Sequence, residues 1–151
     1  MNIEAAAARY IAFCQSMTPG SLDRLADFCD PRIHFKDPFN EVTDIEGYRR
    51  VLAKMFEDIG QPDFVVTGKA MSGETCFLRW RLTFRRSSDK QDTIQGMSEL
   101  SFTNEGLVDA HFDFWDAGQV YEMVPLLRGL VGLVKRRLSI DGGRSTSARR
   151  N

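Results

Sequence analysis

Ile33-His34-Phe35-Lys36-Asp37-Pro38-Phe39 reads as a short strand that ends in a carboxylate at a corner set by proline. Pro38 cannot donate a backbone hydrogen bond and restricts the residue before it, so the strand ends at Asp37. One interpretation of Asp37 is structural, because an aspartate at a turn bonds nearby backbone amides. The other is a general base on a rigid strand end, where apolar neighbours raise the pKa of a carboxyl group. The residues leave both interpretations open.

A second segment, His111-Phe112-Asp113-Phe114-Trp115-Asp116, alternates polar and apolar side chains. Because side chains of a strand alternate between its faces, His111, Asp113 and Trp115 share one face. If that face looks inward, an imidazole, a carboxylate and an indole line a cavity and suit proton transfer on an apolar substrate. If it looks outward, the two phenylalanines lie in the core instead. Alternation alone does not decide between the two.

Composition predicts one soluble domain of 151 residues with a substantial core. The N-terminus lacks a basic-then-apolar signal pattern, and the apolar stretch at 124–134 is interrupted by Arg128 and too short to cross a bilayer. Cys14, Cys29 and Cys76 form no CxxC pair and no metal-ligand spacing with a histidine. Free thiols of this kind are typical of a reducing compartment, so we expect a cytoplasmic protein.

Charge is distributed unevenly along the chain. Residues 1–117 hold 13 Lys and Arg against 19 Asp and Glu, whereas residues 118–151 hold 7 against 2. The basic end is typical of a solvated helix terminus, and contact with acidic lipid head groups is the alternative. The acidic body and the lack of a nucleic-acid motif predict no nucleic-acid partner. Without a phosphate loop, metal cluster or serine nucleophile motif, we expect no metal and no cofactor.

The periodic patterns predict an α+β domain over residues 1–138. Helices are predicted at 4–17, 21–29, 45–59 and 118–138, and strands at 32–37, 64–71, 75–86, 92–103 and 107–116. A strongly curved sheet of long strands needs helices over its concave face, and we expect a conical pocket between the two layers. The Gly-, Ser- and Arg-rich remainder, 139–151, is expected to be disordered.

This order of elements, with Asp37-Pro38-Phe39 after the first strand, resembles the NTF2-like superfamily, and most of all its ketosteroid-isomerase-like and SnoaL-like members. The resemblance covers roughly residues 5–117. It implies a cone-shaped fold in which a curved antiparallel sheet wraps around N-terminal helices. It also implies that Asp37 shuttles protons, that the helix segment Ala8-Arg9-Tyr10-Ile11 carries an oxyanion-binding tyrosine, and that Trp115 faces the cavity.

Two features depart from the isomerase pattern. Where that enzyme has a protonated aspartate as a second oxyanion donor, the aligned position here is Ser98, a weaker donor. The isomerase lines its last strand with apolar side chains, where this chain has His111 and Asp113. A steroid isomerase is therefore not expected. The implied register turns Phe112 and Phe114 outward, where a second subunit is expected to cover them, so we predict a homodimer through the convex sheet face.

The candidate site combines residues from several elements. The candidate catalytic residues are Asp37 as general base or acid, Tyr10 and His111 as donors, and Asp113 as the residue that orients His111. The candidate ligand-binding residues are expected at the cavity wall: Trp80, Trp115, Phe39, Phe56 and Ser98. Tyr10 also has a structural interpretation, as a core tyrosine whose hydroxyl finds any partner.

Three functions stay open on the sequence alone. One is a cofactor-independent enzyme that isomerises, cyclises or dehydrates a compact apolar molecule, or opens its epoxide. Another is a non-catalytic pocket for a hydrophobic ligand such as a lipid or a polyketide-like metabolite. The third is an interaction module that docks a protein partner. For the helix at 118–138, a lid over the cone is the simplest role, and an interfacial helix on an acidic membrane is the alternative.

Overall fold

The computed structural model describes residues 2–87 and 90–140 of the chain. It divides into two units, Met1–Trp115 and Asp116–Asn151, and each is described by itself. Most of the tail predicted to be disordered, from residue 141 on, lies outside the described residues.

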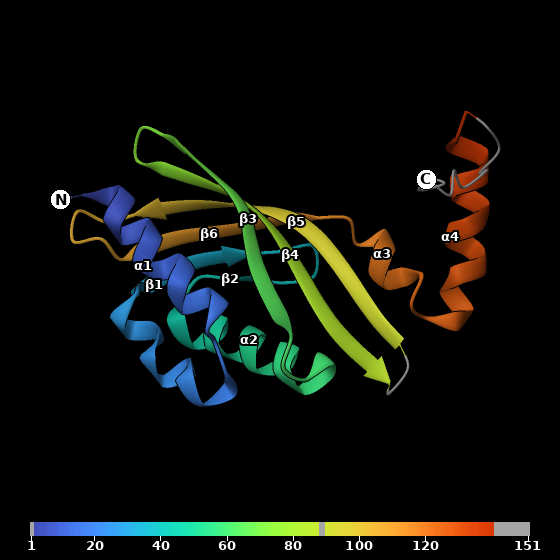
Figure 1. The fold of residues 1–151 in the computed structure, drawn as a ribbon, viewed down its shortest axis with the longest axis horizontal. Helices are drawn as coiled ribbons and strands as arrows, with labels where there is room; N and C mark the ends of the chain where they lie inside the picture. Colours follow the sequence, from blue (N-terminus) through green and yellow to red (C-terminus); the bar gives the residue numbers. More distant parts are fainter. Residues whose placement is uncertain (1, 88–89, 141–151) are drawn as a thin grey trace, which may run out of the picture. The chain divides into compact units, whose positions relative to one another are not determined.

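A six-stranded sheet forms the frame of the first unit (Figure 1). Its strands are β1 (Cys29–Lys36), β2 (Glu41–Val42), β3 (Asp63–Ser72), β4 (Thr75–Ser87), β5 (Lys90–Phe102) and β6 (Val108–Trp115), in the spatial order β2-β1-β6-β5-β4-β3. The predicted antiparallel meander from β3 to β6 is confirmed. The sheet is mixed rather than antiparallel throughout, because β1 runs parallel to β6. That pairing was not predicted, since local alternation does not tell a short strand which neighbour it joins.

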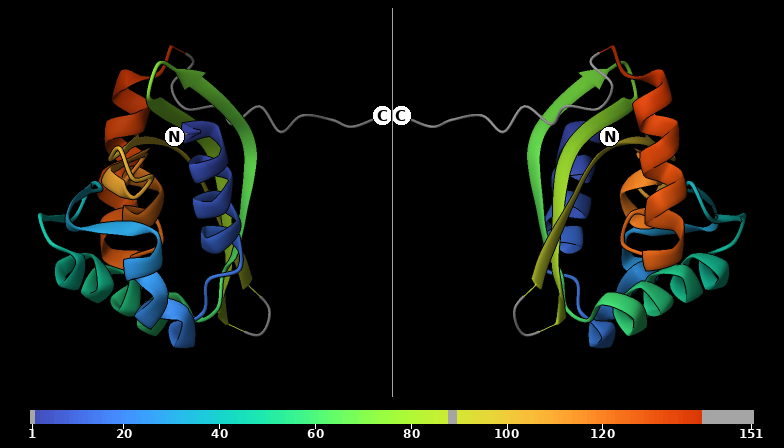
Figure 2. Two further views of the ribbon diagram at one scale, coloured as in Figure 1. Left: turned by 90° about the vertical axis from the view of Figure 1, so that its left-hand side faces the viewer. Right: turned by 90° about the vertical axis from the view of Figure 1, so that its right-hand side faces the viewer.

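Three helical segments cover one face of this sheet. They are α1 (Ile3–Gln15), the 3-10 helix η1 (Pro19–Asp27) and α2 (Ile45–Ile59). The Asp44 side chain accepts a hydrogen bond from the Gly47 amide at 2.6 Å and so caps α2. α1 lies against β3 and β5, and α2 lies against β1 and β4. Figure 2 shows the sheet curling around α1, so the core lies on the concave side.

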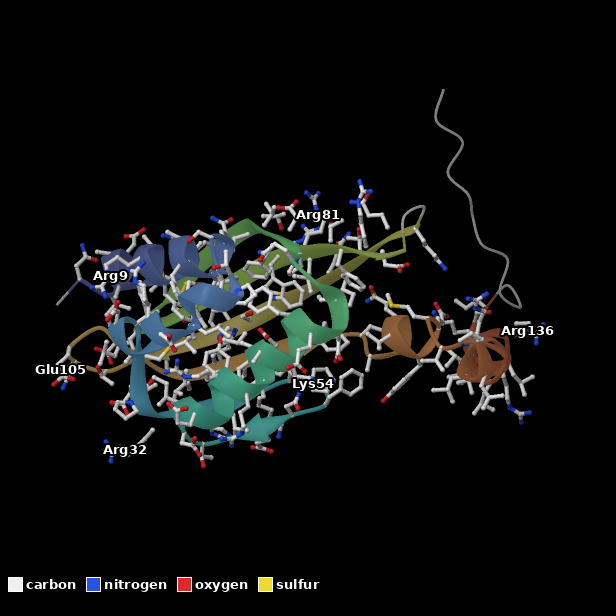
Figure 3. All side chains as sticks on the ribbon, turned by 90° about the horizontal axis from the view of Figure 1, so that it is seen from below. Arg9, Arg32, Lys54, Arg81, Glu105 and Arg136 are labelled. Atoms are coloured by element: carbon white, nitrogen blue, oxygen red, sulfur yellow. The ribbon has the colours of Figure 1, made fainter. Side chains whose placement is uncertain are left out.

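The alternation along β4 decides which of its side chains enter this core. Cys76, Leu78, Trp80 and Phe84 lie on the same side of the strand and are all buried. Burying a large apolar side chain of this kind stabilises the fold by about 1.5–3 kcal/mol. Charged side chains lie at the periphery of the unit in Figure 3, among them Arg9, Arg32, Arg81 and Glu105.

Trp80 rests directly on Gly96 of the neighbouring strand β5. A Cβ atom at position 96 would lie 2.6 Å from Trp80 Cη2 and 3.0 Å from the Phe114 carbonyl oxygen. We therefore expect Gly96→Ala to lower the free energy of unfolding by about 1–3 kcal/mol, measured by urea denaturation. Gly68→Ala is the matched control in β3, where the nearest atom would be Arg79 Cβ at 3.7 Å. Equal stability of the two variants would contradict the close contact.

The second unit contains two helices, α3 (Gly118–Tyr121) and α4 (Pro125–Leu138). The prediction of one continuous helix over 118–138 is therefore wrong. Pro125 restricts the residue before it, and Val124 accordingly has an extended backbone with φ −88° and ψ 116°.

The apolar pattern at 118–138 predicts a helix with one buried side. None of α4 is buried, and Leu130 and Val134 are 61% and 50% exposed. Within residues 116–140, the described part of the second unit, α4 has only the single turn of α3 as a neighbour. That turn offers too little surface to cover an apolar face. Among the described residues, no helix is long and apolar enough to span a membrane.

Candidate functional site

His111 lies at the centre of a buried polar cluster between the sheet and the helices. Its residue is 8% exposed, although imidazoles usually contact solvent. On β6 it pairs in register with Phe35 of β1, whose ring meets the imidazole edge-on at 5.4 Å between centroids. The face of β6 that carries His111 therefore looks toward α1 and α2, as the resemblance implied.

Two tyrosines approach one nitrogen of His111 from the helices. The hydroxyl of Tyr10, on α1, lies 2.8 Å from His111 Nδ1, and the hydroxyl of Tyr48, on α2, lies 3.2 Å from the same atom. The two hydroxyls are 2.9 Å apart. Both tyrosines are 1% exposed, so these contacts satisfy hydroxyl groups that have no access to water.

The other nitrogen of His111 faces a carboxylate on its own strand. His111 Nε2 lies 2.9 Å from Asp113 Oδ1. The Ser98 hydroxyl, directly across the β5–β6 ladder, donates to the same oxygen. Trp80 Nε1 donates to Ser98 Oγ at 2.8 Å. A continuous chain of hydrogen bonds thus links two helices to three strand residues and an indole.

The donors and acceptors of this chain fix the positions of its protons. A carboxylate only accepts, so His111 Nε2 carries a hydrogen and donates it to Asp113. In the neutral imidazole, Nδ1 is then an acceptor and accepts a hydrogen bond from the hydroxyl group of Tyr10. The Tyr48 hydroxyl is left to donate to the oxygen of Tyr10. Every donor in the cluster has an acceptor in this arrangement.

One oxygen of Asp113 accepts no hydrogen bond from the described residues. Both hydrogen bonds to Asp113 end on Oδ1, and no donor in the described part of the chain reaches Oδ2. The Asp113 side chain is 19% exposed, and the His111 side chain beside it is 10% exposed. A carboxylate that is held by one oxygen and open at the other can accept a proton from an outside molecule.

Burial also changes the acidity of the tyrosines. The pKa values of Tyr10 and Tyr48 lie well above the usual value, chiefly because burial disfavours the phenolate. Burial likewise raises the pKa of the nearby Cys29 thiol to about 12. All three groups therefore stay protonated, and the two phenols remain donors at neutral pH.

These shifts predict a loss of stability in alkali. The folded state holds the three protons more tightly than the unfolded chain, so their contribution is complete below about pH 9 and falls above it. As the pH rises from the pKa of a group in the unfolded chain to its pKa in the folded state, that group lowers the free energy of unfolding by up to about 1.4 kcal/mol per pH unit. We expect urea denaturation between pH 8 and 11 to show a smaller decline in Tyr48→Phe. The matched control is Tyr121→Phe, at an exposed tyrosine of α3, and its stability should decline with pH as steeply as that of the parent. An equally steep decline in Tyr48→Phe would contradict the raised pKa of Tyr48.

Asp37 has a different environment from Asp113. Its Oδ1 accepts hydrogen bonds from the amides of Phe39 at 2.7 Å and Asn40 at 2.6 Å, and the Asn40 side chain donates to both of its oxygens at 3.1 Å. The carboxylate therefore holds the turn after β1, as the structural interpretation expected. The β1–β6 pairing ends at Lys36 and Phe112, and Asp37 and Asp113 are the next residues on the two strands.

The remaining candidate residues fall into two groups. Phe39 and Trp115 meet edge-on with 5.2 Å between ring centroids, and Phe39 is 49% exposed. They form an aromatic pair at the end of β6 that carries Asp113. Phe56 of α2 is 8% exposed and belongs to the core. No hydrogen bond links any of these three rings to the His111 cluster.

Tyr48 was not predicted as a site residue, because its position in α2 also fits the apolar side of that helix. The available signal was its hydroxyl, because a buried tyrosine needs a hydrogen-bond partner. No group of three or more His, Cys, Asp or Glu side chains suited to a metal is found in residues 2–87 and 90–140.

Comparisons with known proteins agree with this architecture. The sequence profile of the SnoaL-like domain matches residues 9–111, more than half of the chain. No protein of curated function matches the sequence.

Several solved structures share the fold. A candidate SnoaL-like polyketide cyclase from Jannaschia sp. CCS1 has a TM-score of 0.69 and 17% identity, over 80% of this chain and 89% of its own. A candidate isomerase of the SnoaL-like family from Agrobacterium tumefaciens has a TM-score of 0.63 and 20% identity, over 77% and 99%. A candidate polyketide cyclase from Acidithiobacillus ferrooxidans has a TM-score of 0.65 and 17% identity, over 85% and 96%. Identities of this size show a common fold.

Proposed function

Because the chain belongs to the SnoaL-like domain family, we propose that it is a cofactor-independent enzyme that moves a proton on a compact apolar substrate. The observation that carries the proposal is the open oxygen of Asp113. This oxygen belongs to a carboxylate that His111 and Ser98 hold by its other oxygen. Two solved structures that share the fold are titled as candidate polyketide cyclases, which supports a substrate of polyketide type.

The proposed step begins with a proton on a carbon next to a carbonyl group. Asp113 Oδ2 takes this proton, the C–H bond breaks, and its electron pair moves onto the carbonyl oxygen to give an enolate. In a substrate whose enolate is conjugated with a C=C bond, return of the proton from Asp113 to the far carbon of the dienolate moves the double bond and gives an isomer. Attack of the enolate carbon on a second carbonyl group of the same molecule closes a ring instead, and the oxygen of that second carbonyl group then takes the proton back from Asp113 to become a hydroxyl group. No oxidant or reductant is needed in either case.

The other members of the cluster act on Asp113 rather than on the substrate. His111 and Ser98 fix the orientation of the carboxylate, and Tyr10 and Tyr48 keep His111 in the tautomer that donates from Nε2. Tyr10 is therefore a positioning residue in this proposal, in place of the oxyanion donor that the resemblance implied. Asp37 holds the turn beside the site.

The substrate is expected to be uncharged. The inward positions that surround Asp113 on β4, β5 and β6 are apolar, aromatic or weakly polar: Leu78, Trp80, Gly96, Ser98 and Trp115. None of these side chains is cationic, so a carboxylate or phosphate on the substrate would have no counterion there.

A deuterium-exchange experiment tests the proposal even when the final product has not been identified. The purified protein is incubated in D2O with uncharged cyclic ketones of one to three rings, and proton NMR follows the signal of the carbon next to the carbonyl. We expect exchange faster than in buffer for at least one ring size. Binding of these ketones without any exchange would instead indicate a non-catalytic pocket.

A second copy of the chain is the proposed partner. Met97 of β5 and Phe114 of β6 pair across the ladder and are 51% and 60% exposed. They lie on the face of the sheet opposite to His111 and Asp113, because successive residues alternate between faces. Two neighbouring large apolar side chains that face water favour contact with a like surface, as in a two-fold dimer.

A further inference from the structure

α4 carries an apolar surface that the described residues of the second unit do not cover. Its apolar side chains are exposed to different degrees: Leu126 89%, Leu138 78%, Leu130 61%, Leu133 57%, Val134 50% and Leu127 37%. At 3.6 residues per turn these positions fall on one broad side of the helix. Arg128, Lys135 and Arg136 fall on the opposite side. The helix is therefore amphipathic, with a cationic polar face.

The helix needs a partner surface to be stable. It has 14 residues, and isolated helices of this length are marginal in water. Gly129 and Gly132 weaken it further, since each glycine costs about 1 kcal/mol relative to alanine. Within the described structure, a Cβ atom added at either glycine would meet no neighbouring element within 4 Å. Close packing of another element against the helix therefore does not explain these two glycines.

The charges of α4 indicate what kind of surface fits. Between Pro125 and Leu138 the sequence has four basic residues and no acidic residue. Lys135 forms an ion pair with Glu122, and Arg128 Nε donates a hydrogen bond to the Glu122 carbonyl oxygen at 3.2 Å. Neither contact involves Arg136 or Arg137, which can meet an outside anion. Arg137 lies at the C-terminal end, where a long side chain can extend past an apolar layer to reach charged groups.

We propose that α4 docks in the plane of an anionic lipid bilayer. Its leucines and valines enter the boundary between head groups and acyl chains, and its arginines contact the anionic head groups. At 14 residues the helix lies on the bilayer, because spanning requires about 20 apolar residues. This inference does not rest on the proposed function.

Vesicle flotation with the full chain tests the proposal. One set of vesicles contains phosphatidylcholine alone, and the other contains phosphatidylcholine with phosphatidylserine at about 30 mol%, a composition whose surface attracts basic segments. We expect the partition coefficient to be at least tenfold higher for the anionic vesicles at low salt and to fall as salt is added. The double variant Arg136→Gln/Arg137→Gln should lose about 25-fold, since each basic residue contributes roughly fivefold. Leu130→Ser should lose about tenfold through its apolar contact.

The control variant is Arg81→Gln, which removes one exposed charge from β4 in the first unit and should leave the partition unchanged. Equal partition into both kinds of vesicle, or none into either, would overturn the proposal. Hydrogen exchange gives an independent readout. Amides of α4 should exchange quickly without vesicles and slowly with anionic vesicles. Slow exchange in the absence of vesicles would show that α4 packs on protein, either as a lid or on a second copy, and would also overturn it.

Discussion

Asp113→Asn is expected to lower turnover of a ketone substrate by about 10²–10⁴-fold, the range that a positioned general base contributes. The amide oxygen of asparagine can still accept the hydrogen bonds of His111 and Ser98, so the site keeps its shape. The amide nitrogen cannot take a proton from carbon. We therefore expect the loss in kcat, with substrate affinity changed less than about threefold. Steady-state kinetics and tryptophan-fluorescence titration measure the two quantities.

Two further variants separate the roles of His111 and Asp37 from that of Asp113. His111→Gln keeps a donor toward Asp113 but removes the imidazole, and we expect a smaller loss in kcat of about tenfold and an altered pH profile. Asp37→Asn leaves the Asp113 cluster intact and is expected to act mainly on stability through the turn after β1. If Asp37→Asn abolished turnover while Asp113→Asn retained it, the base would be Asp37 and the assignment made above would be wrong.

Phe114→Asp is expected to raise the dissociation constant of the homodimer by at least about 100-fold. Phe114 lies beside Met97 on the outer face of the sheet, and burying an unpaired carboxylate between two such faces costs several kcal/mol. The fold and the hydrogen bonds of Asp113 should be unaffected, because position 114 is already 60% exposed in the single chain. Sedimentation velocity over a range of micromolar concentrations measures the change.

The matched control for that variant is Ser72→Asp, which adds the same charge at the exposed end of β3. It should leave the dissociation constant as it is in the parent. A parent protein that sediments as a monomer at all concentrations, or a Phe114→Asp variant that dimerises as tightly as the parent, would reject the proposed interface.

Local signals were enough to predict most elements of the fold. Asp44 and Gly60 mark the two ends of α2, and the helix runs from Ile45 to Ile59 as predicted. Alternation along β4 separated its two faces, and the structure shows which of them is buried. The parallel pairing of β1 with β6 could not be predicted from local signals, because it joins residues that are distant in sequence, such as Phe35 and His111. The break before α4 had a local signal in Pro125, which the continuous apolar pattern concealed.

The site was predictable in part. Tyr10, Ser98, Trp80, His111 and Asp113 were all named as candidates, but their connection into one chain of hydrogen bonds depends on side-chain positions that no pattern encodes. The role of Tyr48 required knowing that α2 passes over His111. The side of β6 that faces inward likewise followed from the family resemblance and not from the alternation itself.

The bond between Tyr10 and His111 spans 101 positions of the chain. A ribosome therefore releases the first helix long before the strand that its hydroxyl must meet. Until β6 emerges, Tyr10 and Tyr48 have no imidazole to bind, and the entropy of closing so large a loop opposes early assembly. The centre of the molecule is consequently completed late in folding, and a polypeptide that stops short of Asp113 would contain most of the sheet yet lack the group proposed to act as the base.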